Sequence, residues 1–461
     1  MAATSQPQHP VEEPLILGPQ DNPSLTRTLY NNIWQPPKQG WWILFGICLL
    51  GVGMYVTSIV TVVSQGIGVW GNQIPVGWAF DIINFVWWIG IGHAGTLISA
   101  ILLLFQQKWR TSINRFSEAM TIFAVMCAAV YPILHTGRPW FSAYWLFPWP
   151  NTMSIWPQFK SPLMWDVFAV STYFITSLLF WFMGLIPDLA GLRDRTESRV
   201  ARAIYGLFSL GWRGSAQQWT HWHTAYNLLA AFSTPLVLSV HTIVSWDFAV
   251  GLMPGWHATI FPPYFVAGAV FSGFAMVMSL MIPARHFLNL KHVVTMKHLE
   301  NINKIILTTS MIVAYGYLME YFCAFYSGNR FESYIFTQRL IGAYWPVYWT
   351  LLACNVVIPH LFWFKRARTN IPLMWIVSIF VNVGMWTERF IIIVGSLYND
   401  FLPSKWHLYI PRPVDFGVFF GSMFFFGMLF LLFLRFLPPV AVAEMKELNA
   451  EMNAHHEAEA A

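Results

Sequence analysis

Ten long apolar stretches alternate with short polar segments along this chain. Each stretch exceeds the roughly 20 residues that a helix needs to cross about 30 Å of hydrocarbon. The pattern therefore predicts an all-α polytopic membrane protein with about ten transmembrane helices. The predicted spans are residues 41–63, 79–105, 116–137, 165–189, 225–249, 263–284, 304–327, 343–364, 371–396 and 416–437.

Composition and charge placement agree with this class and set an orientation. Apolar residues make up 56% of the 461 residues, and charged residues make up 10%. With the N-terminus in the cytoplasm, 19 of the 26 Lys and Arg residues fall on the cytoplasmic side and six on the opposite side. This positive-inside bias predicts that both termini are cytoplasmic. The net charge of +5 follows from the topology, and we expect no nucleic-acid partner.

Signals for cleavage, metals and nucleotides are weak in this sequence. The first 40 residues are polar and Pro-rich, so we expect no cleaved signal peptide and take the first span as the insertion signal. The four cysteines are widely separated, and no CxxC or Cys-His spacing occurs. We therefore expect no zinc or iron–sulfur site built by this chain alone. There is also no GxGxxG or phosphate loop.

Several predicted spans contain ionisable side chains, each of which costs on the order of 3 kcal/mol at the bilayer centre. His135 ends the third span, Asp166 opens the fourth and Asp247 ends the fifth, all on the outer side. We expect these three to converge, with Asp81 at the outer start of the second span joining them. The deeper ionisable groups are His93, His241, Glu320, Glu388 and Arg389.

Most of these groups also have a purely structural interpretation. Asp81 and Asp166 lie near helix N-termini, where a carboxylate caps the helix and complements its dipole. Glu320 and Arg389 can form a buried ion pair without any chemistry. Asp247 differs, because it lies at a helix C-terminus, where the dipole opposes a carboxylate. Function is therefore the better explanation for Asp247.

A histidine and two aspartates at one outer end suit the oxidation of a quinol. This reaction removes two electrons and two protons, and histidine, with an unperturbed pKa of about 6.5, is a suitable proton acceptor. A carboxylate can orient the histidine or take the second proton. The predicted catalytic residues are His135, Asp166 and Asp247, and the predicted pocket residues are Tyr131, Arg138, Trp140, Phe141 and Trp165. The electrons require a partner with redox centres, which we expect on the outer face.

Three short motifs carry a family resemblance. HTGRPW at 135–140, MWD at 164–166 and SWDF at 245–248 resemble the NrfD-like, or polysulfide reductase membrane subunit, family over essentially the whole membrane region. The start EEPLILG and the entry KQGWW resemble the larger of the two NrfD-like subunits of bacterial alternative complex III. The family layout implies two four-helix bundles, residues 79–249 with the quinol site and residues 263–396. A flanking helix lies on each side of them, at residues 41–63 and 416–437. The remaining parts are a cytoplasmic segment at residues 1–40 and a cytoplasmic tail at residues 438–461.

The resemblance implies a subunit of a respiratory quinol:electron-acceptor oxidoreductase in the bacterial inner membrane. The implied substrate is menaquinol or another quinol near the periplasmic face, and this chain is expected to bind no haem and no iron–sulfur cluster. The implied partners are a periplasmic iron–sulfur subunit, multihaem cytochrome c subunits, a second NrfD-like membrane subunit and lipids. The quinol-site roles carry over to His135, Asp166 and Asp247. Candidates for a proton path are Asp81, His93, His241, Glu320, Glu388 and Arg389.

Two other functions fit part of the pattern. His93 and His241 are candidates to ligate one haem b from adjacent spans, although His93 beside two glycines also suits an interhelical hydrogen bond. A secondary transporter would have Gly- or Pro-broken helices at corresponding positions in both halves. Pro132, Pro235 and Pro346 form no clear repeat of this kind.

Overall fold

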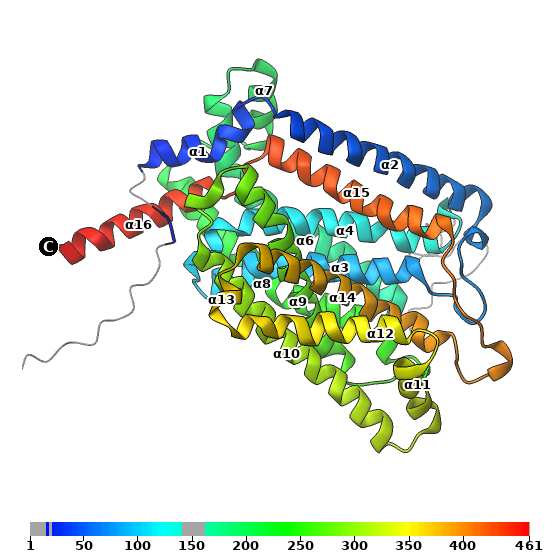
Figure 1. Cartoon of the computed structure of the whole chain (residues 1–461). Helices are drawn as coiled ribbons and strands as arrows, with labels where there is room; N and C mark the ends of the chain where they lie inside the picture. The colour runs from blue at the N-terminus through cyan, green and yellow to red at the C-terminus, as the bar shows by residue number, and fades with distance from the viewer. Residues whose placement is uncertain (1–14, 18–20, 141–161, 461) are drawn as a thin grey trace, which may run out of the picture.

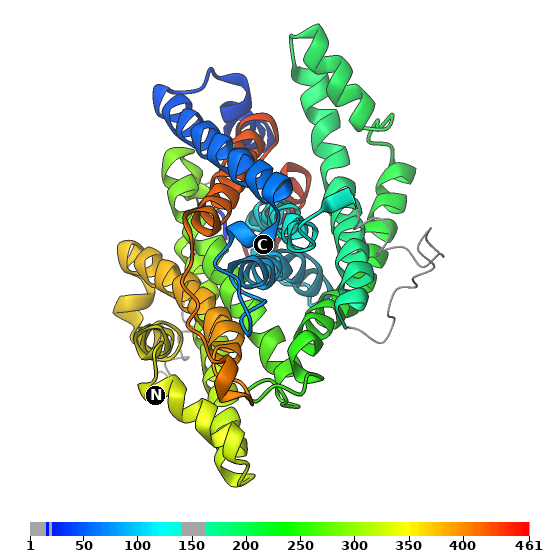
Figure 2. The same cartoon turned by 90° about the vertical axis from the view of Figure 1, so that its right-hand side faces the viewer.

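The computed structural model describes residues 15–17, 21–140 and 162–460. Across these residues the regular structure is entirely helical, with no strand. Ten helices of the described chain are long and apolar enough to span a membrane. The predicted fold class and number of spans are therefore confirmed. Figure 1 shows the long helices side by side, and Figure 2 turns them toward the viewer.

The helix boundaries agree with the predicted spans to within several residues at most ends. The spanning helices are α2 (Gln39–Gln65), α3 (Phe80–Leu104), α4 (Asn114–His135), α6 (Pro162–Arg195), α8 (Ala216–Ala249), α9 (Phe261–Phe287), α10 (Met296–Tyr326), α14 (Ile371–Leu397), α15 (Pro413–Phe436) and α12 (Trp345–Leu352), which continues through a π-helical turn (Ala353–Val357) and a 3-10 turn (Ile358–Trp363). The shorter helices are α1 (Asn22–Trp34), α7 (Arg199–Phe208), α11 (Arg330–Ile341), α13 (Lys365–Arg368) and α16 (Val442–Ala460).

Helix α3 lies at the centre of the molecule. It packs against α4 and α8 of the first half and against α9 and α14 of the second half. Helices α3, α4, α6 and α8 thus share one core with α9, α10, α12 and α14, so the two predicted bundles meet across a broad contact. Helices α2 and α15 pair along one flank, as Figure 1 shows.

Small residues allow α3 to approach its neighbours closely. A Cβ atom at Gly95 would overlap the hydroxyl of Thr121 and the carbonyl of Ser117, both on α4. A Cβ atom at Gly273 of α9 would overlap the side chain of Ala94. Without a hydrophobic driving force between helices in lipid, such close backbone contacts supply much of the packing attraction.

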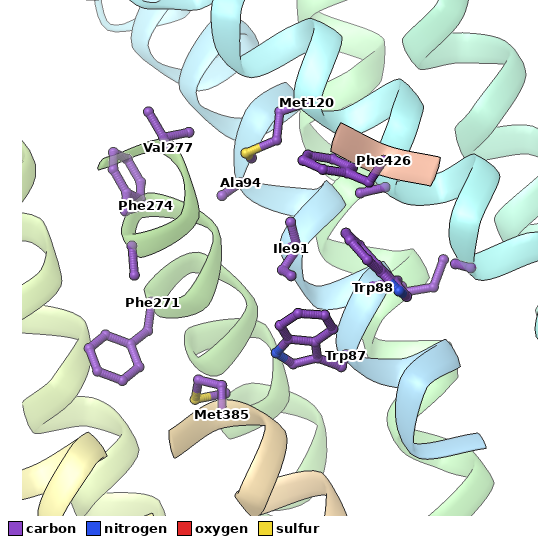
Figure 3. Close-up of a cluster of buried hydrophobic side chains, with 14 of the residues drawn as sticks. Trp87, Trp88, Ile91, Ala94, Met120, Phe271, Phe274, Val277, Met385 and Phe426 are labelled. Carbon is purple, nitrogen blue, oxygen red and sulfur yellow. The ribbon is translucent and has the colours of Figure 1, made fainter. Parts of the chain in front are cut away.

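Large apolar side chains fill the space between these close contacts (Figure 3). The indole of Trp88 is buried and donates to the hydroxyl of Ser422 at 3.0 Å, and the indole of Trp87 donates to the carbonyl of Asn382 at 3.2 Å. These bonds satisfy the polar atoms of two large core residues. The labelled core residues come from α3, α4, α9, α14 and α15: Trp87, Trp88, Ile91, Ala94, Met120, Phe271, Phe274, Val277, Met385 and Phe426.

Five shorter helices of the described chain lie outside the predicted spans, namely α1, α7, α11, α13 and α16. The C-terminal tail forms α16, and its Met445 and Leu448 are buried. Part of the N-terminal segment forms α1, and the outer connection before α12 contains α11. These helices are amphipathic or polar and contain no long apolar run, so the hydrophobic pattern does not reveal them.

Candidate functional site

The outer end of α4 carries a histidine–aspartate pair. His135, the last residue of α4, donates through Nδ1 to the carboxylate of Asp81 in the first turn of α3. The other carboxylate oxygen of Asp81 accepts from the backbone N–H of Ala79 at 3.1 Å. The Asp81 side chain is 1% exposed, whereas that of His135 is 26% exposed. A buried carboxylate therefore orients an accessible imidazole and leaves its Nε2 as the outward-facing nitrogen.

Aromatic rings surround this pair. Trp78 lies edge-on to His135, with ring centres 6.5 Å apart. The same indole contacts Phe248 at 6.1 Å and Trp256 at 5.6 Å. Since Phe248 follows Asp247 in α8, Trp78 connects the end of α4 with the end of α8. The sequence interpretation did not include Trp78.

The two predicted catalytic aspartates form a second pair. Asp166 on α6 and Asp247 on α8 are 5% and 7% exposed, and their carboxyl groups lie close enough to interact. All four carboxyl oxygens are buried, and none has a hydrogen-bond partner among the described residues. Two carboxyl groups buried together are suited to hold and pass a proton, because both cannot readily be ionised at once. The structure therefore groups the predicted outer residues as two pairs, with Asp81 and not Asp166 beside His135.

The predicted pocket residues lie in different surroundings. Tyr131 is fully buried, and its hydroxyl donates to Ser422 on α15 at 2.8 Å. This hydroxyl bridges α4 and α15. Arg138 and Trp140 are exposed just beyond α4, and Trp165 is half-buried beside Trp246, with ring centres 5.7 Å apart. Phe141 lies outside the described residues.

A polar group of side chains occupies the middle of the first half. The rings of His93 and His241 lie 4.6 Å apart, and His93 stacks on Tyr173 at 4.7 Å. Nδ1 of His93 donates to the carbonyl of Ile89 at 2.6 Å, so this nitrogen carries a hydrogen. Nε2 of His93 and both nitrogens of His241 are buried without a partner in the described chain. The hydroxyl of Tyr173 also contacts that of Thr96 at 3.1 Å.

The geometry of His93 and His241 does not fit axial ligation of a haem. Two imidazoles on opposite sides of one iron need ring centres roughly 6 Å apart, since each metal–nitrogen bond is about 2 Å long. The observed rings lie 4.6 Å apart at 61°. This spacing leaves no space for an iron between them. Elsewhere in the described residues, no three His, Cys, Asp or Glu side chains gather in a way that would hold a metal ion.

A buried charged cluster lies at the inner end of the first half. The guanidinium of Arg115 is 1% exposed and pairs with Asp188 at 3.3 Å and Glu118 at 3.6 Å. It also donates to the carbonyl of Gly184 at 2.6 Å. The hydroxyl of Tyr226 donates to Glu118 at 3.1 Å. These contacts compensate charges that would otherwise be costly to bury.

The C-terminal helix completes this inner cluster. Glu444 of α16 accepts from Arg110 at 2.6 Å and from Asn114 at 2.9 Å. Asp188 in turn accepts from the backbone N–H of Ala443 at 3.0 Å, at the start of α16. A carboxylate at this position satisfies an unpaired N–H group and complements the helix dipole. The tail is therefore docked by charge and by capping, not only by apolar packing.

The second half pairs its charges differently from the prediction. Glu320 pairs with Arg339 of α11 at 3.6 Å, and Arg389 pairs with its chain neighbour Glu388. The expected Glu320–Arg389 ion pair is therefore wrong. Arg339 is 4% exposed and also donates to the carbonyl of Gly255 at 3.2 Å. The charge pattern assigns Arg339 to the outer side, but α11 folds it into the core.

Glu388 is the centre of a second buried network. It accepts from the hydroxyl of Tyr317, and from that of Tyr264 at 3.3 Å. Asn355 donates to the Tyr317 hydroxyl at 2.9 Å from the π-helical turn that follows α12. Arg389 stacks over Phe265 at 4.2 Å. π-Helical turns inside membrane helices often accompany functional sites, so this network is a candidate for proton movement.

Several site residues were missed for identifiable reasons. Glu118 and Asp188 fall within predicted spans, so the signal that found His93 and Asp247 was present for them too. Arg115 was assigned only to the positive-inside bias. Glu444 lies in a tail whose sequence shows no membrane signal. Only its long-range contact with Arg110 identifies it.

Ten helices long and apolar enough to span a membrane, with buried ionisable pairs between them, define a polytopic membrane protein. Residues 68–399 match the family described as Polysulphide reductase, NrfD. The chain belongs to this family. The match extends from just after α2 to the end of α14 and therefore includes both halves.

Two curated proteins are similar to this chain. One, from Halobacterium salinarum, is provisionally named as a membrane subunit of dimethyl sulfoxide reductase and is 24% identical over 236 residues, which are 48% of this chain and 49% of that protein. The other is a selenate reductase subunit from Mesobacillus selenatarsenatis, 20% identical over 367 residues, which are 77% of this chain and 81% of that protein. The match thus spans about half of the first relative's length and about four-fifths of the second's.

Proposed function

We propose that this chain is the quinol-binding membrane subunit of a respiratory oxidoreductase complex. The observation that carries this proposal is the His135–Asp81 pair, a carboxylate-oriented imidazole at the outer end of the membrane region. The Asp166–Asp247 pair on the neighbouring helices supplies a second proton acceptor. Family membership and the names of the two relatives, both of which are reductase subunits, support the same function.

The proposed reaction releases two protons and two electrons from one quinol. Nε2 of His135 takes the proton of one hydroxyl, and Asp81 stabilises the resulting imidazolium through Nδ1. The Asp166–Asp247 pair takes the proton of the other hydroxyl. Both electrons leave to a partner subunit, and the quinone then departs. Trp78 and the neighbouring aromatic rings limit access of water to the acceptor groups.

The identity of the partners is part of the proposal. The motifs HTGRPW, MWD and SWDF and the N-terminal segment favour alternative complex III, with a periplasmic iron–sulfur subunit, multihaem cytochrome c subunits and a second NrfD-like subunit. The substrate would be menaquinol. A reductase assembly like those for which the two relatives are named is the second candidate. Covalent haem staining of the complex purified through this chain decides between them, because only the first assembly contains multihaem cytochrome c subunits.

Proton movement through the first half is a further part of the proposal. The first half contains a charged cluster with Glu444 and Glu118 and a separate group formed by Tyr173, His93 and His241. The unpartnered ring nitrogens of the two histidines can accept and donate protons there. We therefore assign His93 and His241 to one proposed path in the first half, and Glu320, Glu388 and Arg389 to a second in the other half.

The test is quinol oxidation by the intact complex. His135→Ala removes the proton acceptor, and turnover should fall by about 10²-fold, the lower end of the range for a lost general base. His407→Ala, on an exposed outer segment, is the matched control and should retain turnover. Unchanged turnover of His135→Ala in an assembled complex would rule out the proposed role.

A further inference from the structure

Helix α7 exposes an apolar face although it spans no membrane. Val200, Ile204, Leu207 and Phe208 are 70%, 51%, 70% and 51% exposed. Their spacing places them on one side of the helix. On the inward side, the hydroxyl of Tyr205 donates to the carbonyl of Phe436 at 3.0 Å. An apolar face of this kind is unfavourable in water and is typical of a helix that lies in a membrane interface.

The contacts of α7 place it level with the end of the membrane region. Phe436 is the last residue of α15, and the preceding Arg435 donates to the carbonyl of Gln35 at 2.7 Å, just before α2 begins. Helix ends of spanning segments mark the boundary between hydrocarbon and head groups. Helix α7 therefore lies along that boundary, on the side that the charge bias assigns to the cytoplasm.

Positive charge surrounds this helix. Residues 190–215 contain five arginines and two acidic residues. A cavity of about 660 Å³ lies beside α7 and the end of α15. Arg195 and Arg435 line it together with hydroxyl groups of Thr196, Ser198 and Tyr205, the carboxylate of Glu197, and the apolar side chains of Ile33, Trp34 and Phe436.

We propose that this α7 corner, defined as α7 with Arg195 and Arg435, binds an anionic phospholipid of the cytoplasmic leaflet. Guanidinium groups bind phosphate through several parallel hydrogen bonds, and the hydroxyl groups of Thr196 and Ser198 supply additional donors. The acyl chains lie against Trp34, Phe436 and the apolar face of α7. A free phosphate would leave that apolar face uncovered. The combination of apolar face, arginines and interfacial level therefore fits a lipid.

The experiment is a lipid titration of the intact complex, delipidated in detergent and followed by native mass spectrometry. Each basic group near an anionic surface contributes about a fivefold preference. Arg195→Gln should therefore raise the dissociation constant for phosphatidylglycerol about fivefold, and Arg195→Gln with Arg435→Gln about 25-fold. Binding of phosphatidylcholine should change little. The matched control is Arg330→Gln with Lys405→Gln, two exposed basic residues on the outer side, and it should retain phosphatidylglycerol binding.

Each outcome decides the proposal. Equal phosphatidylglycerol affinity in the wild type and both arginine variants overturns it. If the arginine variants lose a protein subunit from the complex and not the lipid, the α7 corner is a protein interface, and this result would also overturn the proposal. The single Arg195→Gln variant keeps the test informative if the double variant assembles poorly, since Arg435 also holds Gln35. Quinol turnover is not needed for this measurement, so failure of the proposed function would not affect it.

Discussion

Asp81→Asn tests the proposed proton acceptor more sharply than removal of His135. Asparagine keeps the size of the side chain, and its carbonyl can still accept from the backbone N–H of Ala79. It loses the negative charge that stabilises a protonated His135. Helix α3 should therefore keep its start, while the accepting imidazole loses its ionic partner.

The contact between Asp81 and His135 sets the size of the expected loss in turnover. A charge pair about 4 Å apart gains about 4 kcal/mol at an effective dielectric constant of 20. Since the His135 side chain is 26% exposed, we discount this gain to about 3 kcal/mol for solvent screening. Each 1.36 kcal/mol is a tenfold change in rate, so turnover should fall about 10²-fold.

The assay is steady-state quinol oxidation by the purified complex, normalised to the assembled subunit. Asp400→Asn is the control, because Asp400 lies on an outer connection, where its carboxylate accepts a local backbone bond from Leu402. A variant Asp81→Asn that assembles and turns over like the wild type would refute the assigned role of the pair. A loss confined to assembly, with normal specific activity, would show that Asp81 only caps α3.

Three further outcomes are expected from changes elsewhere. Asp247→Asn should preserve assembly and lower quinol turnover, and normal specific activity with poor assembly would show a structural role instead. Glu320→Gln should leave the buried guanidinium of Arg339 without its ionic partner and destabilise the fold by about 3–5 kcal/mol, measured by thermal unfolding of the purified complex. The double variant Glu320→Gln, Arg339→Gln should recover most of this stability. A double variant that is as unstable as Glu320→Gln alone would contradict the pairing. Gly95→Leu should separate α3 from α4 at Thr121 and lower the folded yield, whereas an unchanged melting temperature would contradict the close contact.

The outer site was only partly predictable from the sequence. His135, Asp166, Asp247 and Asp81 were all identified, because each is an ionisable group at a span end, where the position along the helix gives its depth. The pairing was not predictable. Which carboxylate faces His135 depends on the rotation of each helix about its axis, and packing sets that rotation.

The same limit explains the wrong ion pair. Glu320 and Arg389 were paired because they were expected at similar depth on neighbouring spans, but Arg339 of α11 pairs with Glu320. The position of a residue along a span does not give the direction in which its side chain points.

The sequence by itself determined the class of the protein and the number of spans, and it predicts their orientation and the depth of the ionisable groups. These properties follow from local hydrophobicity and charge, because lipid excludes unpaired polar backbone and each span must cross the same thickness. Only the tertiary structure decided which groups meet, including the contact between Glu444 in the tail and Arg110 at the inner end of the first half. Such contacts join residues hundreds of positions apart, and they form only when helix packing brings their faces together.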